Sequence, residues 1–223
     1  MPDFTDLRRR MVDNQIRTAD VTHRPLLAAM DEVPREMFAP EASKPFAYSD
    51  QHLLVGRIDA RSENRYALSP ALIARMLQAV EPVQNAKVLH VACGTGYASA
   101  IFAKLGADVV ALDEDPALIA AAEHALAEAR ALGVRTRVGM LPDGDTAGAP
   151  FDVIFIEGAY EVEPRSLLDQ LSEGGRLLGV SGLGRAAQVM LQVKTEGLVT
   201  GRAVFDASAP LLQAFARKPE FAF

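Results

Sequence analysis

Hydrophobic residues in the central part of the chain come in short runs that alternate with stretches of helical spacing. A short apolar run between turn residues is typical of a buried strand, and apolar residues three and four apart are typical of a helix. The expected strands are Val88–Val91, Val109–Leu112, Thr136–Gly139, Phe151–Ile156 and Arg176–Val180. The expected helices between them are Tyr97–Leu105, Ala117–Ala131 and Pro164–Leu171. This alternation predicts a doubly wound, Rossmann-like sheet in which the strands are parallel.

The pattern changes after Val180. Two runs, Gln188–Lys194 and Gly201–Phe205, read as strands with a short turn between them, which predicts an antiparallel hairpin at one edge of the sheet. Gly174-Gly175 is expected to form a turn, and a further short strand is expected around Leu211–Ala216. The expected fold class is therefore α/β, with a mostly parallel seven-stranded sheet and an antiparallel C-terminal hairpin.

The N-terminal part reads as helical. Its apolar positions fall at helical spacing in two groups: Phe4, Leu7, Met11 and Val12, then Leu26, Leu27 and Met30. Thr22 is expected to cap the second helix. Residues 45–66 lack apolar periodicity and predict a loop, whereas Ser69-Pro70 opens an amphipathic helix. We expect a helical cap with a substrate-side loop over residues 1–68 and a Rossmann-like cofactor-binding domain over residues 69–223.

The strand Val88–Val91 runs through small residues, Ala92-Cys93-Gly94-Thr95-Gly96, into a helix that begins at Tyr97. Glycines let a ligand approach the backbone, and the first N–H groups of the helix attract a carboxylate or phosphate. The small residues Ala92, Gly94 and Gly96 are each separated by one residue, unlike the G-x-G-x-x-G of dinucleotide sites. This spacing favours S-adenosylmethionine over a dinucleotide, and no phosphate-binding P-loop motif occurs.

Acidic residues follow the next strand. Asp113 is placed to accept the ribose hydroxyls of a nucleoside, because Asp115 is the better cap for the helix at Pro116. Glu114 is a further candidate contact, although a solvated position is expected for it. At the end of the third strand, Met140 and Leu141 suit either an apolar wall for the adenine or the core.

Two residues of the turn region have competing interpretations. His90 is either a cofactor contact or, as general burial trends favour, a hydrogen-bonded histidine inside the sheet. Cys93 lies at a helix N-terminus, which can lower a thiol pKa, but a small filling residue is the simpler interpretation.

Composition narrows the class of protein. A length of 223 residues fits one sizeable domain or a domain with a cap. A net charge of -6, with no basic cluster beyond Arg8-Arg9-Arg10, disfavours a nucleic-acid partner. Cys93 is the single cysteine, so an internal disulfide and a cysteine-based zinc site are excluded. No apolar run is long enough to cross a bilayer, and the N-terminus lacks a secretory pattern, so we expect a cytoplasmic protein that does not bind membranes. Its oligomeric state stays open.

Several segments together resemble the protein-L-isoaspartate O-methyltransferase family of class I methyltransferases. They are Met11–Ile16, Val33–Phe38, Ala47-Tyr48, Val88–Tyr97, Ala149–Ile154, Glu157–Ala159 and Gln170–Leu177. The resemblance implies binding of S-adenosylmethionine at the turn (His90, Ala92, Cys93, Gly94, Gly96, Tyr97), at Asp113 and Glu114, and at Met140 and Leu141. It also implies methyl transfer to a carboxylate, with an isoaspartyl protein or peptide as the partner.

Three positions depart from the family pattern. A T-I-S-x-P run with a serine beside the reacting groups is replaced by Tyr66-Ala67-Leu68-Ser69-Pro70. The acid and glycine that usually open the turn are His90 and Ala92, and the G-D-G after the third strand reads Gly139-Met140-Leu141.

These departures shape the expected substrate site. Tyr66, Leu68 and Ser69 are expected to line it, with the Ser69 hydroxyl as a hydrogen-bond donor to the substrate or simply as a helix cap. Arg57, Arg61 and Arg65 either attract an acidic substrate or are solvated. A carboxylate acceptor is already ionised at neutral pH, so no general base is required. Two alternatives stay open: a same-fold methyltransferase with another substrate, and a non-catalytic module that has lost the cofactor.

Overall fold

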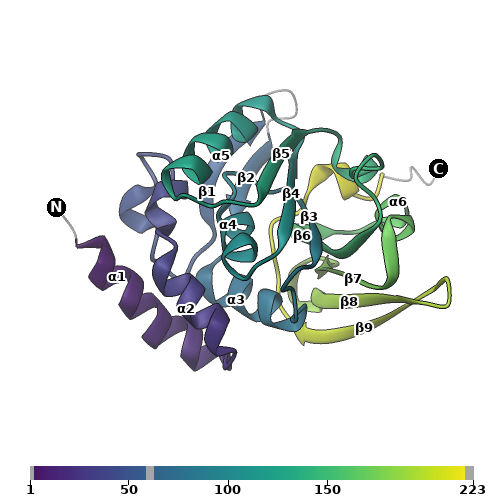
Figure 1. Ribbon diagram of the computed structural model, residues 1–223, viewed down its shortest axis with the longest axis horizontal. Helices are drawn as coiled ribbons and strands as arrows, with labels where there is room; N and C mark the ends of the chain where they lie inside the picture. The colour runs from purple at the N-terminus through teal and green to yellow at the C-terminus, as the bar shows by residue number, and fades with distance from the viewer. Residues whose placement is uncertain (1–2, 59–62, 219–223) are drawn as a thin grey trace, which may run out of the picture.

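The computed structural model describes residues 3–58 and 63–218 and contains one seven-stranded sheet (Figure 1). The strands follow the order β5-β4-β3-β6-β7-β8-β9. Their bounds are β3 Lys87–Val91, β4 Asp108–Asp113, β5 Val134–Val138, β6 Phe151–Tyr160, β7 Leu171–Ser181, β8 Gln188–Thr195 and β9 Leu198–Asp206. The pairs from β5 to β7 are parallel, and β8 and β9 are antiparallel to their neighbours. The predicted fold class is confirmed.

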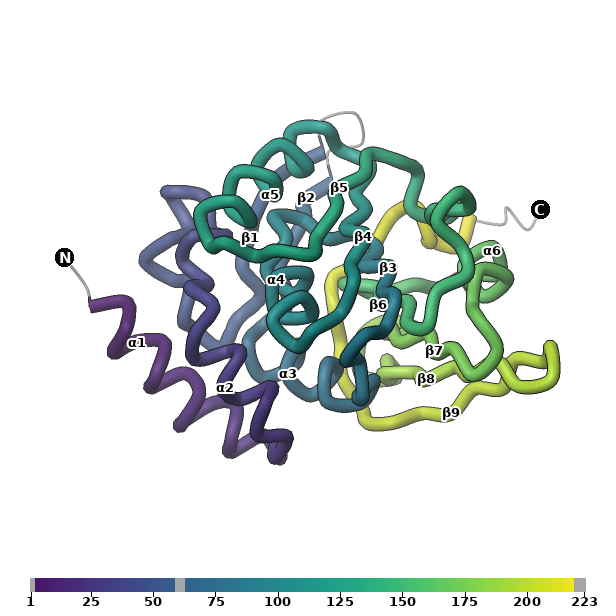
Figure 2. The backbone as a smooth tube through the Cα atoms, viewed as in Figure 1, coloured from purple at the N-terminus to yellow at the C-terminus, as the bar shows by residue number. Residues whose placement is uncertain are grey.

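Helices cover both faces of the sheet, as the tube in Figure 2 also shows. Alternate strand residues separate into two hydrophobic clusters because successive side chains of a strand point to opposite faces. Val88, Val109 and Val153 pack with helices α3 to α5, whereas Leu89 and Ile154 belong to the cluster that contains α6. The helices are α3 Pro70–Ala79, α4 Tyr97–Lys104, α5 Pro116–Glu128 and α6 Arg165–Asp169. In the described part of the chain, no helix combines the length and apolar character that a membrane span requires.

The N-terminal segment forms α1 Phe4–Met11, a π-helical turn Val12–Ile16 and α2 Arg24–Glu32. The prediction that Thr22 caps the second helix is wrong, since His23 occupies that position and makes no side-chain cap. The Thr22 N–H donates instead to the Gln78 side chain at 2.7 Å, which ties the helix entry to α3. Apolar residues of α1, α2 and α3 share one buried cluster with the sheet, so the boundary between residues 68 and 69 stays a prediction.

The predicted loop over residues 45–66 is wrong in its second half. Strands β1 Leu53–Ile58 and β2 Glu63–Ala67 pair antiparallel as a separate two-stranded sheet. Side chains alternate between buried and exposed along both strands, but the charged residues among them hide the alternation in the sequence. Arg61, one of the three arginines named above, lies outside the described residues.

Two smaller predictions are also corrected. Gly174 and Gly175 lie within β7 and not in a turn between elements. The pairing of β7 with β6 begins at Leu171, and its register shifts before Arg176, so both glycines fall in the irregular part of the strand. The short strand predicted around Leu211–Ala216 is reduced to one bridge between Leu211 and Ala159, followed by a 3-10 turn. The C-terminal hairpin, in contrast, is confirmed as β8 and β9.

Candidate functional site

The small-residue turn adopts backbone conformations that favour glycine. Ala92, Gly94 and Gly96 have φ values of 60°, 53° and 91°. The left-handed conformation of Ala92 is costly for a residue with a Cβ, by about 1–2 kcal/mol. This explains why the family pattern has glycine where this chain has alanine. Gly96 is the N-cap of α4, so the turn leads directly into a helix N-terminus, as predicted.

Asp113 ends β4 beside this turn and is fully buried. Its Oδ2 accepts from the Gly94 N–H at 3.0 Å, and its Oδ1 accepts from the Glu114 N–H at 2.8 Å. Burial raises the pKa of the Asp113 carboxyl, while the nearby Arg65 guanidinium and the two N–H groups act in the opposite direction. Asp115, not Asp113, caps α5 through the Ala117 N–H at 2.8 Å, so Asp113 is free of the capping role, as expected.

Arg65 of β2 reaches the same carboxylate. Its Nε lies 3.4 Å from Asp113 Oδ2, and its Nη2 lies 3.4 Å from Asp113 Oδ1. The guanidinium also contacts Glu114 at 3.1 Å and Glu63 at 3.4 Å, and only 1% of its side chain is exposed. The expectation of a solvated Glu114 is therefore wrong, because the pair with Arg65 holds its side chain at 4% exposure.

The β1–β2 hairpin covers the turn as well. A Cβ atom placed on Gly94 would lie 3.1 Å from Val55 Cγ2 and 3.7 Å from Arg65 Cγ. Gly56 lies against α5, since a Cβ there would lie 2.5 Å from Leu118 Cδ2. The backbone of β1 therefore approaches α5 where a larger residue would clash.

His90 is fully buried in β3. Its Nδ1 lies 2.7 Å from Ser99 Oγ, and its Nε2 lies 2.9 Å from Glu157 Oε2, although the ring N–H is not aimed at that oxygen. The expected buried, hydrogen-bonded histidine is thus observed. Ser99, His90 and Glu157 are the residue types of a hydrolase catalytic triad. Ser99 is fully buried, however, so its hydroxyl cannot attack a substrate.

Glu157 also fixes the entrance to α3. Its Oε1 accepts from the Leu68 N–H at 3.0 Å, and Arg35 Nη2 donates to the Leu68 carbonyl at 2.7 Å. Leu68 is fully buried, so its side chain faces the core. The neighbouring Tyr66 is partly buried, and its hydroxyl contacts the Asn64 amide at 3.3 Å.

Ser69 is partly exposed at the start of α3. It stands at the N-cap position, but its side chain makes no capping hydrogen bond. Its backbone N–H donates to His52 Nδ1 at 3.0 Å. Burial lowers the pKa of His52 from its ordinary value of 6.5, which keeps the ring neutral and able to accept this bond. The Ser69 hydroxyl is therefore not committed to the helix cap.

The remaining predicted contacts fall in different surroundings. Cys93 is buried in a small apolar cluster, and burial raises the pKa of its thiol well above the ordinary value, so the lowered pKa considered above is not found. The Tyr97 ring faces the N-terminal segment, where it packs on Phe38 and beneath Arg35. Leu141 is part of the core, whereas Met140 is 55% exposed.

Sequence reasoning missed Glu157 and His52 and misjudged Arg65. Glu157 lies within a buried strand directly after four apolar or aromatic residues, which was the one local signal for it. Arg65 lies on β2 and His52 directly before β1, both within the segment that was expected to be a loop, and nothing in their local pattern marks them.

A parallel sheet with a glycine-rich turn after β3 and an acid at the end of β4 defines a Rossmann-like nucleoside-binding protein. A model of the protein-L-isoaspartate(D-aspartate) O-methyltransferase family matches residues 6–206. The chain belongs to this family, and the resemblance seen in the sequence is confirmed, with the O-methyltransferase class it implied.

Two relatives carry the name protein-L-isoaspartate O-methyltransferase. The protein-L-isoaspartate O-methyltransferase of Roseiflexus sp. (strain RS-1) is 37% identical over 199 residues, covering 87% of this chain and 86% of the relative. That of Methanoculleus marisnigri is 33% identical over 192 residues, covering 86% and 84%.

Solved structures agree on the fold. A protein-L-isoaspartate O-methyltransferase superposes with a TM-score of 0.81 at 21% identity, covering 94% of this chain and 67% of that one. A Plasmodium falciparum structure in complex with S-adenosyl-L-homocysteine gives 0.77 at 16% identity, covering 93% and 98%. At these sequence identities, both structures support the fold alone.

Proposed function

We propose that this chain transfers the methyl group of S-adenosylmethionine to a carboxylate, with L-isoaspartyl residues of damaged proteins as the acceptor. The single observation that carries the proposal is the pairing of the glycine turn with Asp113, joined by the Gly94 N–H at 3.0 Å, in a chain of this family. The family name supplies the acceptor.

The chemical groups around the turn suit the binding of S-adenosylmethionine. Gly94 and Gly96 offer a backbone without side chains, α4 offers its N-terminus, and Asp113 offers a carboxylate for hydroxyl groups. The cofactor, when bound, supplies an electrophilic methyl group. The Arg65 side chain stands against Asp113 and must leave it before hydroxyl groups can reach both oxygens.

The chain's own contribution is alignment rather than proton transfer. A carboxylate is ionised at neutral pH, so an acceptor of this kind needs to be oriented and partly stripped of water. The uncommitted Ser69 hydroxyl is suited to orient the acceptor, because Glu157, Arg35 and His52 fix the backbone that leads into this residue. Tyr66 precedes Ser69 by three residues, on β2, and we propose it for the same site.

Two measurements test the proposal. Calorimetric titration with S-adenosylhomocysteine should detect binding, and no heat at millimolar ligand would refute the cofactor assignment. Transfer of a tritiated methyl group should be seen with an isoaspartyl peptide and not with its aspartyl twin. Equal transfer to both peptides would indicate another substrate.

We further propose that the protein works in the cytoplasm on protein substrates rather than on nucleic acids or membranes. A single buried cysteine suits a reducing compartment. The net charge of -6 disfavours a polyanionic partner.

A further inference from the structure

We propose that Arg65 competes with the cofactor for Asp113, so that the β1–β2 hairpin sets how tightly this chain binds S-adenosylmethionine. The inference rests on the proposed function, because the competing ligand is the cofactor named there. It concerns a residue of the hairpin, which contributes no strand to the main sheet.

The Asp113 carboxylate has a limited number of acceptor positions. A carboxylate has about four lone-pair sites. Two are used by the N–H groups of Gly94 and Glu114, and Arg65 also approaches each of the two oxygens, at 3.4 Å. The hydroxyl groups of a bound ribose would need the acceptor sites that the two N–H groups leave. The guanidinium and the ribose therefore exclude each other.

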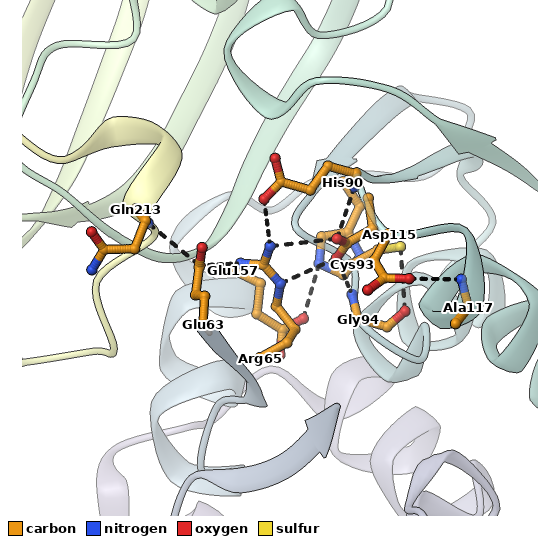
Figure 3. A network of polar contacts seen from close by, with 11 residues as sticks. Glu63, Arg65, His90, Cys93, Gly94, Asp115, Ala117, Glu157 and Gln213 are labelled. Carbon is orange, nitrogen blue, oxygen red and sulfur yellow. Dashed lines mark hydrogen bonds and ion pairs between the residues drawn. The ribbon is translucent and has the colours of Figure 1, made fainter. Parts of the chain in front are cut away.

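The β1–β2 hairpin covers the glycine turn as well as Asp113. Val55 of β1 lies over Gly94, at the place where a nucleoside would approach the backbone. Figure 3 shows Arg65 reaching from its strand toward the turn at Cys93 and Gly94. Moving the side chain of Arg65 alone would leave Val55 in place, so binding requires the hairpin to shift.

The contacts that Arg65 makes with its acidic partners are long. The N···O distances between the Arg65 guanidinium and its acidic partners run from 3.1 to 3.4 Å, longer than the 2.7–2.9 Å typical of charged hydrogen bonds. Its buried Nε makes an ion pair but no hydrogen bond. Among the residues that the structure describes, β1 and β2 pair only with each other, so no strand pairing ties the hairpin to the main sheet.

The test compares binding of S-adenosylhomocysteine, by titration calorimetry, to the wild type and to Arg65→Ala. We expect the variant to bind about tenfold more tightly, because a competing closed state reduces apparent affinity by the fraction that is open. Arg135→Ala is the matched control. It removes an exposed arginine that pairs with Asp108 at 3.0 Å at the other end of β4, and its affinity should equal that of the wild type.

Each outcome is informative. Equal or weaker binding by Arg65→Ala, with measurable binding by the wild type, overturns the competition but leaves the proposed function intact. Absence of binding by all three proteins at millimolar ligand overturns the proposed function, and the competition with it. Binding by Arg65→Ala alone supports both.

Hydrogen exchange on the wild type provides a second test if Arg65→Ala does not fold. Saturating S-adenosylhomocysteine should speed amide exchange in the paired residues of β1 and β2 and slow it around β3 and β4. Ligand protection of β3 and β4 with unchanged exchange in the hairpin would show that the hairpin stays in place, which contradicts the proposal.

Discussion

Replacing Glu157 should reveal how strongly the entrance to α3 is tied to the sheet. In Glu157→Ala the buried Leu68 N–H loses its acceptor at 3.0 Å, and His90 loses its neighbour at 2.9 Å. An unsatisfied buried donor costs about 1–3 kcal/mol. Because the Leu68 N–H is fully buried and His90 loses a neighbour as well, we expect the upper end, about 3 kcal/mol.

Urea unfolding measures this loss. With a slope of about 2 kcal/mol per M, the midpoint should fall by about 1.5 M. Glu157→Gln should lose about 1 kcal/mol or less, because its oxygen can still accept from Leu68 and its amide can donate to His90 Nε2. That arrangement requires the His90 proton on Nδ1, where it faces Ser99 Oγ at 2.7 Å.

An exposed acid in a similar pair provides the control. Glu128 lies 3.6 Å from His124 on the surface of α5, so Glu128→Ala should change stability by less than about 0.5 kcal/mol. A midpoint for Glu157→Ala that matches this control would refute the reasoning. So would a glutamine variant as unstable as the alanine variant.

Three further predictions concern the same region. Arg35→Lys should lower thermal stability by about 2–4 kcal/mol, since one ammonium cannot replace both the bond to Ala47 at 2.9 Å and the bond to Leu68 at 2.7 Å; calorimetric melting measures it. Ser69→Ala should leave stability within about 0.5 kcal/mol, as its side chain makes no cap, yet reduce methyl transfer to an isoaspartyl peptide about tenfold; urea midpoints and tritium transfer separate the two effects. Burial lowers the pKa of His52 in the folded protein below its ordinary value of 6.5. The stability that the neutral ring contributes is therefore complete above pH 6.5 and is lost as the pH falls through the folded pKa. Between about pH 7 and pH 5, the urea midpoint of His52→Asn should fall by less than that of the wild type.

Several elements followed directly from local pattern. The buried runs of β3, β4 and β6 are almost wholly apolar because both faces of a parallel sheet are covered, and this made them visible in the sequence. The turn at Gly94 and Gly96 needs positive φ, which glycine signals by itself. Asp115 before Pro116 marked a helix start through local hydrogen bonding alone.

Other features depended on partners far away in the chain. Glu157 and Leu68 meet across 89 residues, and Arg65 meets Asp113 across 48. A charged side chain in a sequence gives no sign of whether it will be solvated or buried in an ion pair, because its surroundings come from segments that fold around it. The β1–β2 hairpin was missed for the same reason, since its buried positions include Glu63 and Arg65.

The sequence by itself therefore determined the alternation of strands and helices from β3 to β9, the glycine turn and the acid at the end of β4, all of which are set by neighbours within a few residues. Only the tertiary structure decided what lies on that site. It placed the Arg65 guanidinium against Asp113 and fixed the backbone around Ser69 through Glu157, Arg35 and His52. Burial decides these contacts, because a charge removed from water must find a partner wherever the fold provides one.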